Sequence, residues 1–456
     1  MRRKILWGGL IAIFLIVAGG TIFLNIWIDR YLRSDAFRTT VEEKTGFALK
    51  LKASFEPFRW TGMSVYSDRF IGVADASNIS AQRVRAGFNL RAILTGAWQL
   101  NDLDIGRLDT VFGTPTQNPV PAAKPEFVIP VKKPAAWTAF LPQRFEVERV
   151  VVGDGNFSWG SGGLGTGAVQ GTAITATPGS NGWNINAKNG KLLMKQFPDL
   201  LIDSAKLRSQ RGTFYISDAQ MRTADNGAVQ ASGERDSDGA LQLKIQWQKV
   251  LVQSLLQDPW NTHLTGLLQG TANLQSRADA PPIIDGDFTL TEGLLQGIPL
   301  QEKIATFTRV PEYQRLPIQQ LSGNYHIQAG SIAFTNLVLE SKGLLRVEGT
   351  CLIQKDGSLG GTLRVGVTSQ SLQWLPGSQA RVFTVSKNGY LWTDVQLSGT
   401  IQNPRENLSA RLLTAATGEI IDTGINAGKS LLQSPSNAED TIKKAQGILK
   451  QLVPLP

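Results

Sequence analysis

The chain has 456 residues, of which 42% are hydrophobic and only 18% charged, and its net charge is +9. The low charge content and the 46 glycines favour many half-buried strands joined by tight turns. The single cysteine excludes an internal disulfide, and two histidines far apart in the chain argue against a zinc site. Neither a metal nor another cofactor is expected.

The basic residues beyond the N-terminus are scattered singly along the chain. No zinc-finger pattern, RNA-binding signature or basic helix is present, so nucleic acid is not an expected partner. An attraction to anionic lipid head groups is compatible with the charge.

An apolar run covers residues 5–28, directly after Arg2, Arg3 and Lys4. At 1.5 Å per residue it reaches about 36 Å, enough to span a hydrocarbon core of about 30 Å. The basic flank places the N-terminus in the cytoplasm and the rest of the chain across the membrane. The alternative is a signal peptide cleaved near Ala18-Gly19-Gly20, but the run continues well beyond those small residues. We therefore predict an uncleaved anchor whose apolar contacts include Trp7, Leu10, Phe14, Leu15, Phe23 and Trp27.

A short helix is predicted after the anchor, with Ser34 as its N-cap, Phe37 and Val41 on one face and Gly46 as its stop. The hydrophobic period then becomes two, most clearly over 241–248 and 363–368, and earlier over 84–90. Tight turns are predicted at Asp154-Gly155, Asn181-Gly182, Asn189-Gly190, Asp225-Asn226-Gly227, Asp238-Gly239 and Asp356-Gly357. These patterns predict a mostly β protein, an elongated and curled antiparallel meander of roughly 35 strands at about ten residues per strand and turn.

Two segments interrupt the meander. Residues 113–142 contain seven prolines and are predicted to form an extended linker or insertion. The segments on either side, 100–108 and 145–152, resemble each other, which suggests two copies of one β unit. Near the C-terminus, Leu408, Leu412, Ala416 and Ile420 follow helical spacing, and a second amphipathic helix is predicted after Glu439. This pair either packs on its own domain or lies on a membrane.

Two patterns that suggest chemistry do not support an enzyme. The glycines of 160–165 satisfy the dinucleotide-binding spacing, but strand-like residues follow where that fold requires a helix. The acidic residues Glu234, Asp236 and Asp238 are followed by no bidentate glutamate at calcium-loop spacing, so a hairpin turn is predicted there. No serine lies in a nucleophile elbow. The chain is therefore not expected to be an enzyme.

From Ile284 onwards the sequence resembles the C-terminal region of AsmA-like proteins. The resemblance begins with IDGDFTLTEGLLQGIPLQEKIATFTRV, continues through LSGNYHIQAGSIAFTNLVLESKGLLRVEGTCLIQKDGSLGGTLRVGV and ends with VQLSGTIQNPRENLSARL. The N-terminal plan of anchor, short helix and strands is also similar, whereas the proline-rich segment departs from the family pattern. The domains predicted are the anchor (1–30), a helix with an N-terminal β-groove (31–112), the linker (113–142), an AsmA-like β-groove (143–406) and C-terminal amphipathic helices (407–456).

The resemblance implies a single-pass inner-membrane protein with its bulk in the periplasm, which binds and conducts phospholipid between membranes and supports the integrity of the outer membrane. Envelope or outer-membrane proteins are possible partners. A meander with one apolar face must cover it with a second sheet, helices or a ligand. The side chains expected to line a lipid groove are Phe88, Leu241, Leu243, Ile245, Trp247, Ile332, Phe334, Val347, Leu363, Val365 and Val367. A non-transporting scaffold or assembly factor and an array of compact β-sandwiches remain as alternatives.

Overall fold

The computed structural model describes residues 30–415 except for 75–76, 90–91, 93–96, 114–143, 161–165, 196, 257, 278–279, 299–300, 302–304, 306–309, 374–377 and 413. The described chain is mostly β, as predicted, and falls into two compact units. Unit 1 comprises Met1–Ala224 and Gln230–Leu241, and unit 2 comprises Asp225–Val229 and Gln242–Pro456. None of the helices described has the length and apolar character needed to cross a membrane. Residues 1–29 of the predicted anchor, the proline-rich segment from residue 114 and the chain after 415 lie outside the described residues.

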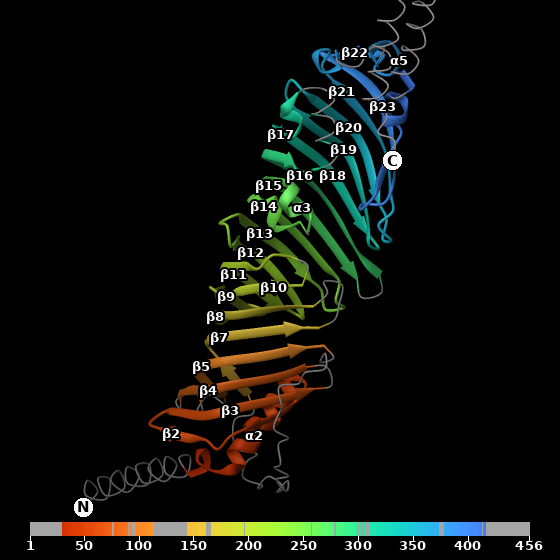
Figure 1. The fold of residues 1–456 in the computed structure, drawn as a ribbon. Helices are drawn as coiled ribbons and strands as arrows, with labels where there is room; N and C mark the ends of the chain where they lie inside the picture. The colour runs from red at the N-terminus through yellow and green to blue at the C-terminus, as the bar shows by residue number, and fades with distance from the viewer. Residues whose placement is uncertain are drawn as a thin grey trace, which may run out of the picture. The chain divides into compact units, whose positions relative to one another are not determined.

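Unit 1 combines one helix with a sheet of long strands (Figure 1). Its elements are α2 (Asp35–Leu49), β1 (Lys52–Phe55), β2 (Arg59–Thr61), β3 (Ser64–Ala74), β4 (Ser77–Asn89), β5 (Ala97–Phe112), β6 (Arg144–Val147), β7 (Val150–Trp159), β8 (Gly167–Gly179), β9 (Gly182–Lys188), β10 (Lys191–Met194), β11 (Leu200–Gln210) and β12 (Thr213–Thr223). β13 (Ala228–Arg235) and β14 (Leu241–Leu251) cross the boundary between the units. Strands β1 and β2 both pair with β3, and antiparallel pairing continues through β4 to β5 and from β7 through β8, β9 and β10 to β11 and β12.

One junction of unit 1 is parallel, which corrects the prediction of a purely antiparallel meander. β5 pairs in parallel with both β6 and β7, and Leu100, Leu103 and Ile105 lie opposite Val147, Val150 and Val152. These are the apolar positions whose spacing repeats on either side of the proline-rich segment. Parallel neighbours need a long crossover connection, and the chain between β5 and β6 supplies one.

Unit 2 consists of antiparallel strands with short helical turns at the strand ends (Figure 1). Its elements after β14 are η3 (Val252–Ser254), α3 (Trp260–His263), β15 (Leu264–Arg277), β16 (Ala280–Gln296), η4 (Pro311–Tyr313), β17 (Arg315–Ile318), β18 (Gln320–Gln328), β19 (Ser331–Ser341), β20 (Leu345–Ile353), β21 (Leu359–Val367), η5 (Gln370–Leu372), α5 (Ser378–Arg381), β22 (Val385–Lys387), β23 (Tyr390–Gly399) and β24 (Pro404–Glu406). The pairing runs from β15 through β16, β18, β19, β20 and β21 to β23, and β17, β22 and β24 are short additions.

The strands are longer and fewer than predicted. The described residues contain 24 strands, several of which run for more than ten residues, such as β5 with 16 and β16 with 17. Four of the predicted turns fall between strands, and Asn181-Gly182 is displaced by one residue, because Gly182 already begins β9 and pairs with Gly179. The remaining exception is Asp154-Gly155. That dipeptide lies inside β7 at a shift in register with β8, because β5 and β8 pair on both sides of it and Asn156 Nδ2 donates to Asp154 Oδ1 at 3.2 Å.

The helix α2 begins as predicted but ends later. The Ser34 hydroxyl accepts a hydrogen bond from the Phe37 backbone N–H at 3.4 Å, the arrangement of an N-cap. The helix continues past Gly46 to Leu49 and stops at Lys50, whose φ of 52° is left-handed. The Lys50 N–H then bonds the carbonyls of Gly46 and Phe47, so a lysine, and not the glycine predicted, provides the C-terminal cap. Further on, residues 408–412 and 414–415 are helical as predicted.

Candidate functional site

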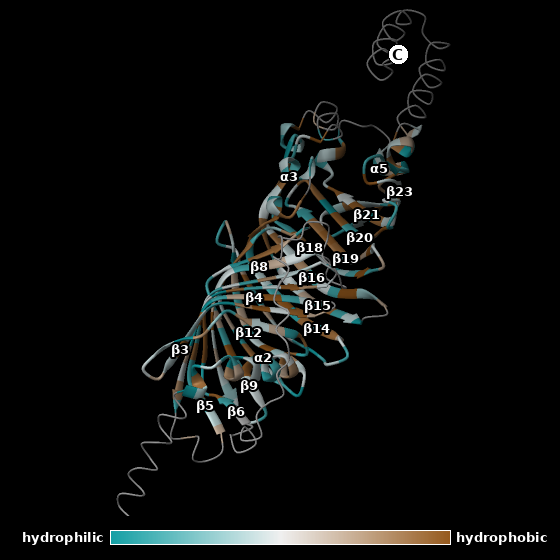
Figure 2. Ribbon diagram, turned by 90° about the horizontal axis from the view of Figure 1, so that it is seen from below, coloured by the Kyte–Doolittle hydropathy of each residue, from teal (hydrophilic) through white to brown (hydrophobic). Residues whose placement is uncertain are grey.

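One face of the unit 2 sheet is apolar across all of its long strands. In an antiparallel pair, residues opposite each other share a face, and so do residues two apart on one strand. Tyr325, Phe334, Cys351 and Gly361 are opposite in turn on β18, β19, β20 and β21 and define one such row. Figure 2 shows the alternation of hydrophobic and hydrophilic segments along these strands. The face, called here the apolar face of unit 2, comprises Leu268, Leu274, Ile284, Phe288, Leu290, Leu321, Tyr325, Ile327, Ile332, Phe334, Leu337, Leu339, Leu345, Val347, Cys351, Ile353, Leu359, Leu363, Val365, Val367, Leu391, Val395 and Leu397.

The predicted groove residues of unit 2 share this face. The cross-strand partners place Ile332, Phe334, Val347, Leu363, Val365 and Val367 on it. On β14, Leu241, Leu243, Ile245 and Trp247 alternate with exposed polar residues. The Trp247 ring lies over Gly270, where a Cβ would come within 2.9 Å of Cζ2. Because Gly270 is opposite Phe288, the β14 residues point to the same side.

The apolar face is covered at one set of strand ends and uncovered along its middle. Val367 is 9% exposed and packs with Leu372, Val382, Phe383 and Ala415, which come from η5, the segment around α5 and the helical residues after 408. A second cluster, around Tyr313 and Leu316, packs against Leu344 and Leu345. Along the middle, side chains such as Phe334, Leu337 and Leu363 are only half-buried. Within the described part of unit 2, no second layer of strands packs on them.

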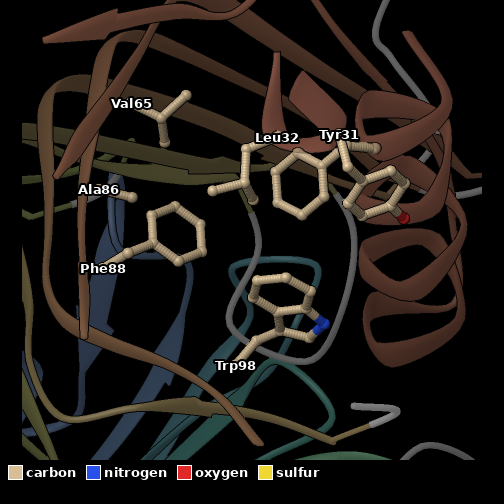
Figure 3. Close-up of a cluster of buried hydrophobic side chains, with 7 residues drawn as sticks. Tyr31, Leu32, Val65, Ala86, Phe88 and Trp98 are labelled. Carbon is tan, nitrogen blue, oxygen red and sulfur yellow. The ribbon is translucent and has the colours of Figure 1, made fainter. Parts of the chain in front are cut away.

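In unit 1 the predicted groove residue Phe88 lies in a closed core (Figure 3). Phe88 is 7% exposed, and Tyr31, Leu32 and Trp98 surround it with Phe37 of α2. The ring centroids of Phe37 lie 6.1 Å from Phe88 and 5.6 Å from Trp98. The helix therefore seals this end of the unit 1 sheet, which corrects the prediction that Phe88 lines an open groove.

The opposite face in each unit is polar and carries ion pairs that are exposed or partly exposed. In unit 1, Arg222 and Asp203 are 2.8 Å apart on β12 and β11, and hydrogen bonding to Arg222 lowers the pKa of the Asp203 carboxyl. In unit 2, Arg346 bonds both Glu340 and Glu348, at 3.2 and 2.7 Å. An exposed pair such as Arg222–Asp203 contributes little to stability, but its charges keep this face in contact with water.

His326 and Asp285 form another contact on the polar face of unit 2, with His326 Nδ1 2.6 Å from Asp285 Oδ1. The hydrogen bond to Asp285 raises the pKa of the imidazole. No third acidic or histidine ligand joins them, and the described residues contain no group of three or more His, Cys, Asp or Glu side chains arranged to hold a metal.

The acidic cluster of 234–238 occupies a hairpin turn, as predicted. The Asp236 N–H bonds the Ala240 carbonyl at 2.8 Å, and the Asp238 carboxylate accepts from the Ala240 N–H at 3.3 Å. These bonds close the connection between β13 and β14. The carboxylate of Asp238 is thus used to order the turn.

Sequence reasoning overlooked Cys351, along with other side chains of the apolar face such as Phe288, Tyr325 and Leu337. Cys351 is the one cysteine of the chain, is half-buried between Phe334 and Gly361, and burial raises the pKa of its thiol. Its neighbour Thr350 is exposed on the polar face. Leu345, Val347 and Cys351 alternate with polar residues, and Gly349 interrupts this apolar series. Assigning Gly349 to the strand would have placed Cys351 on the apolar face from the sequence alone.

No protein-family model, curated protein or solved structure matches this chain. The resemblance to AsmA-like proteins accordingly stays a prediction that rests on the residues quoted above.

Proposed function

We propose that the apolar face of unit 2 binds the acyl chains of phospholipid, and that the protein conducts lipid along it between the inner membrane and the outer membrane. The anchor predicted at the N-terminus would hold the chain at the inner membrane with its bulk in the periplasm. The function requires no catalytic group, because continuous apolar surface with polar rims is sufficient to bind lipid tails.

The observation that carries this proposal is the half-burial of the side chains in the middle of the face. Phe334, Leu337 and Leu363 contact their neighbours within the sheet but no second layer among the described residues. A contiguous apolar surface of this kind is unusual on a soluble protein unless it binds something. The cap formed around Val367 and Phe383 covers one set of strand ends, so a bound acyl chain would lie along the middle of the face.

The polar character of the other face supports lipid binding on the apolar face only. Lys244, Gln246 and Gln248 alternate with the apolar residues of β14 and are exposed. A sheet with one wetted face and one apolar face would bind lipid without exposing its tails on both sides.

The native Cys351 provides a direct test. The full chain is purified in mild detergent, either with its co-purifying lipid or after delipidation, and its thiol is reacted at fixed pH with a charged, water-soluble alkylating reagent. We expect phospholipid to slow the alkylation of Cys351 by about tenfold or more, because acyl chains would exclude the charged reagent. The matched control is Thr350→Cys with Cys351→Ser, which moves the thiol one residue along β20 onto the polar face. Its alkylation rate should not change with lipid.

Mass spectrometry of the material bound to the lipid-protected form identifies the ligand. Phospholipid at a stoichiometric ratio, lost together with the protection of Cys351, would support the proposal. A Cys351 thiol that reacts only after unfolding, with or without lipid, would show a sealed core. A thiol that reacts freely in both preparations would favour the scaffold alternative.

A further inference from the structure

Five exposed apolar side chains of unit 1 lie at one set of strand ends, whereas others, such as Met63 and Phe214, lie at the opposite ends. Phe47 is 88% exposed and Leu49 is 52% exposed at the C-terminal end of α2. Val73 at the end of β3 is 42% exposed, and Val111 and Phe112 at the end of β5 are 39% and 48% exposed. These five residues are called here the apolar rim.

One hollow and the strand pairing place the end of α2 beside the strand ends that carry Val73, Val111 and Phe112. A shallow hollow is lined by Gly46, Lys50, Lys52, Val73 and Ser77, so the end of α2 adjoins the end of β3 and the start of β4. Lys52 is the cross-strand partner of Val73, and Ser77 is the partner of Phe112. Two strand spacings, about 10 Å, separate β3 from β5.

The apolar rim breaks the alternation that holds in the rest of unit 1. Val73 and Val111 both lie opposite Asn78 and share the polar face, whereas Phe112 is one residue further and points to the other face. Deeper on the polar face, the same strand β5 carries Arg107 and Asp109. A surface that packs flat against another sheet needs apolar side chains on one face only. Apolar side chains on both faces of the strand ends are expected where the edge of the sheet inserts into an apolar environment.

The cations around the apolar rim indicate what that medium is. Lys44 and Phe47 are three residues apart on α2 and so share one side of the helix, and Lys50 and Lys52 follow. All three lysines are exposed and none forms an ion pair with a described residue. Exposed aromatic and aliphatic side chains flanked by lysines are the combination that binds the interface of an anionic bilayer.

We propose that the apolar rim docks unit 1 onto the surface of an anionic phospholipid bilayer, with Phe47 and Phe112 in the interface and Lys44, Lys50 and Lys52 at the head groups. The contact is separate from lipid binding by the apolar face of unit 2. The apolar rim also lies away from the point where the chain enters unit 1. Tyr31 belongs to the cluster of Phe88 and Trp98, which lies at the opposite strand ends.

The test uses an environment-sensitive fluorophore on Val73→Cys in a Cys351→Ser background. The full chain is reconstituted into vesicles of phosphatidylcholine alone or mixed with phosphatidylglycerol, both containing nitroxide-labelled lipid as quencher. The matched control is Phe214→Cys, since Phe214 is 47% exposed at the opposite strand ends of the same unit. Attachment through the N-terminal anchor alone would bring position 214 closer to the bilayer than position 73. Quenching at position 73 would therefore not be a result of that attachment.

We expect lipid nitroxide to quench the probe at position 73 in anionic vesicles, much less in neutral ones, and hardly at position 214. Phe47→Ser with Phe112→Ser should shift the docked-to-free ratio by about tenfold toward the free form, as expected for removing two interfacial aromatics. Lys50→Glu with Lys52→Glu should remove the dependence on anionic lipid. Because these side chains are exposed, the melting temperature of each variant should stay within a few degrees.

Equal quenching at positions 73 and 214, or no quenching at either, would overturn the proposal. So would a blue-shifted probe that lipid nitroxide does not quench, since that result indicates a protein or a second copy on the rim. Protection of Cys351 is measured separately on the unmutated chain, so failure of the rim would not be confused with failure of lipid binding by unit 2.

Discussion

Substituting a charged side chain on the apolar side of the unit 2 strands distinguishes two possibilities, a lipid-binding surface and a sealed core. Ile245 is half-buried on β14, between the exposed Lys244 and Gln246. Ile245→Asp removes its burial and adds a carboxylate. Leu290→Asp makes the same change on β16 at a side chain that is 0% exposed, and Gln246→Asp makes it on the polar face.

The expected magnitudes differ severalfold. Complete burial of an isoleucine is worth about 1.5–3 kcal/mol, so a half-buried one that can hydrate its replacement should lose about 1–2 kcal/mol. At Leu290, the cavity and an unpaired buried charge together should exceed about 5 kcal/mol. For a domain of this size, the first loss lowers the melting temperature by about 2–8 °C, and the second should prevent unit 2 from folding. Gln246→Asp should have almost no effect.

The assay combines thermal unfolding of the full chain in detergent with quantification of bound phospholipid. We expect Ile245→Asp to fold and to lose most of its lipid, Leu290→Asp to lose its fold, and Gln246→Asp to keep both. If Ile245→Asp is as damaging as Leu290→Asp, the face is sealed and the reasoning fails. If it folds with undiminished lipid, the lipid lies elsewhere.

Three further changes test the description of the fold. Ser34→Ala should cost about 1 kcal/mol in chemical denaturation by removing the N-cap of α2, and an unchanged midpoint would contradict that role. Gly366→Val should cost about 1–3 kcal/mol because a Cβ there meets the Trp392 ring at 2.9–3.0 Å, and a variant as stable as the parent would show the ring moves freely. The lowered pKa of Asp203 means that its bond to Arg222 stabilises the fold above the ordinary carboxyl pKa of 3.8 and is lost as pH falls through the folded value. Asp203→Asn should therefore reduce the acid-range dependence of stability, most clearly at low salt, and an identical pH profile would refute the assignment.

Local pattern was sufficient for much of the fold. The Asn189-Gly190, Asp238-Gly239 and Asp356-Gly357 turns and the alternation of 363–368 were predicted correctly, because side-chain period and turn chemistry are properties of a few adjacent residues. The same alternation placed Ile332, Phe334 and Val365 on one face before any pairing was known.

The errors arose where a distant segment decides the local structure. Asp154-Gly155 has the composition of a turn, yet it is held in β7 by strands on both sides. Gly46 has the composition of a helix stop, yet α2 continues for three residues until Lys50 adopts the left-handed conformation. The strand count was too high because the strands extend beyond the average spacing of turn residues.

The sequence by itself determined which side chains share a face, since alternate residues of a strand point the same way whatever lies beside them. Only the tertiary structure decided what covers that face. Phe88 and Phe334 follow the same alternating pattern, but α2 closes over Phe88, and no described element packs over Phe334. The parallel pairing of β5 with β7 was likewise a tertiary outcome. A long connection permits either strand direction, and only packing selects one.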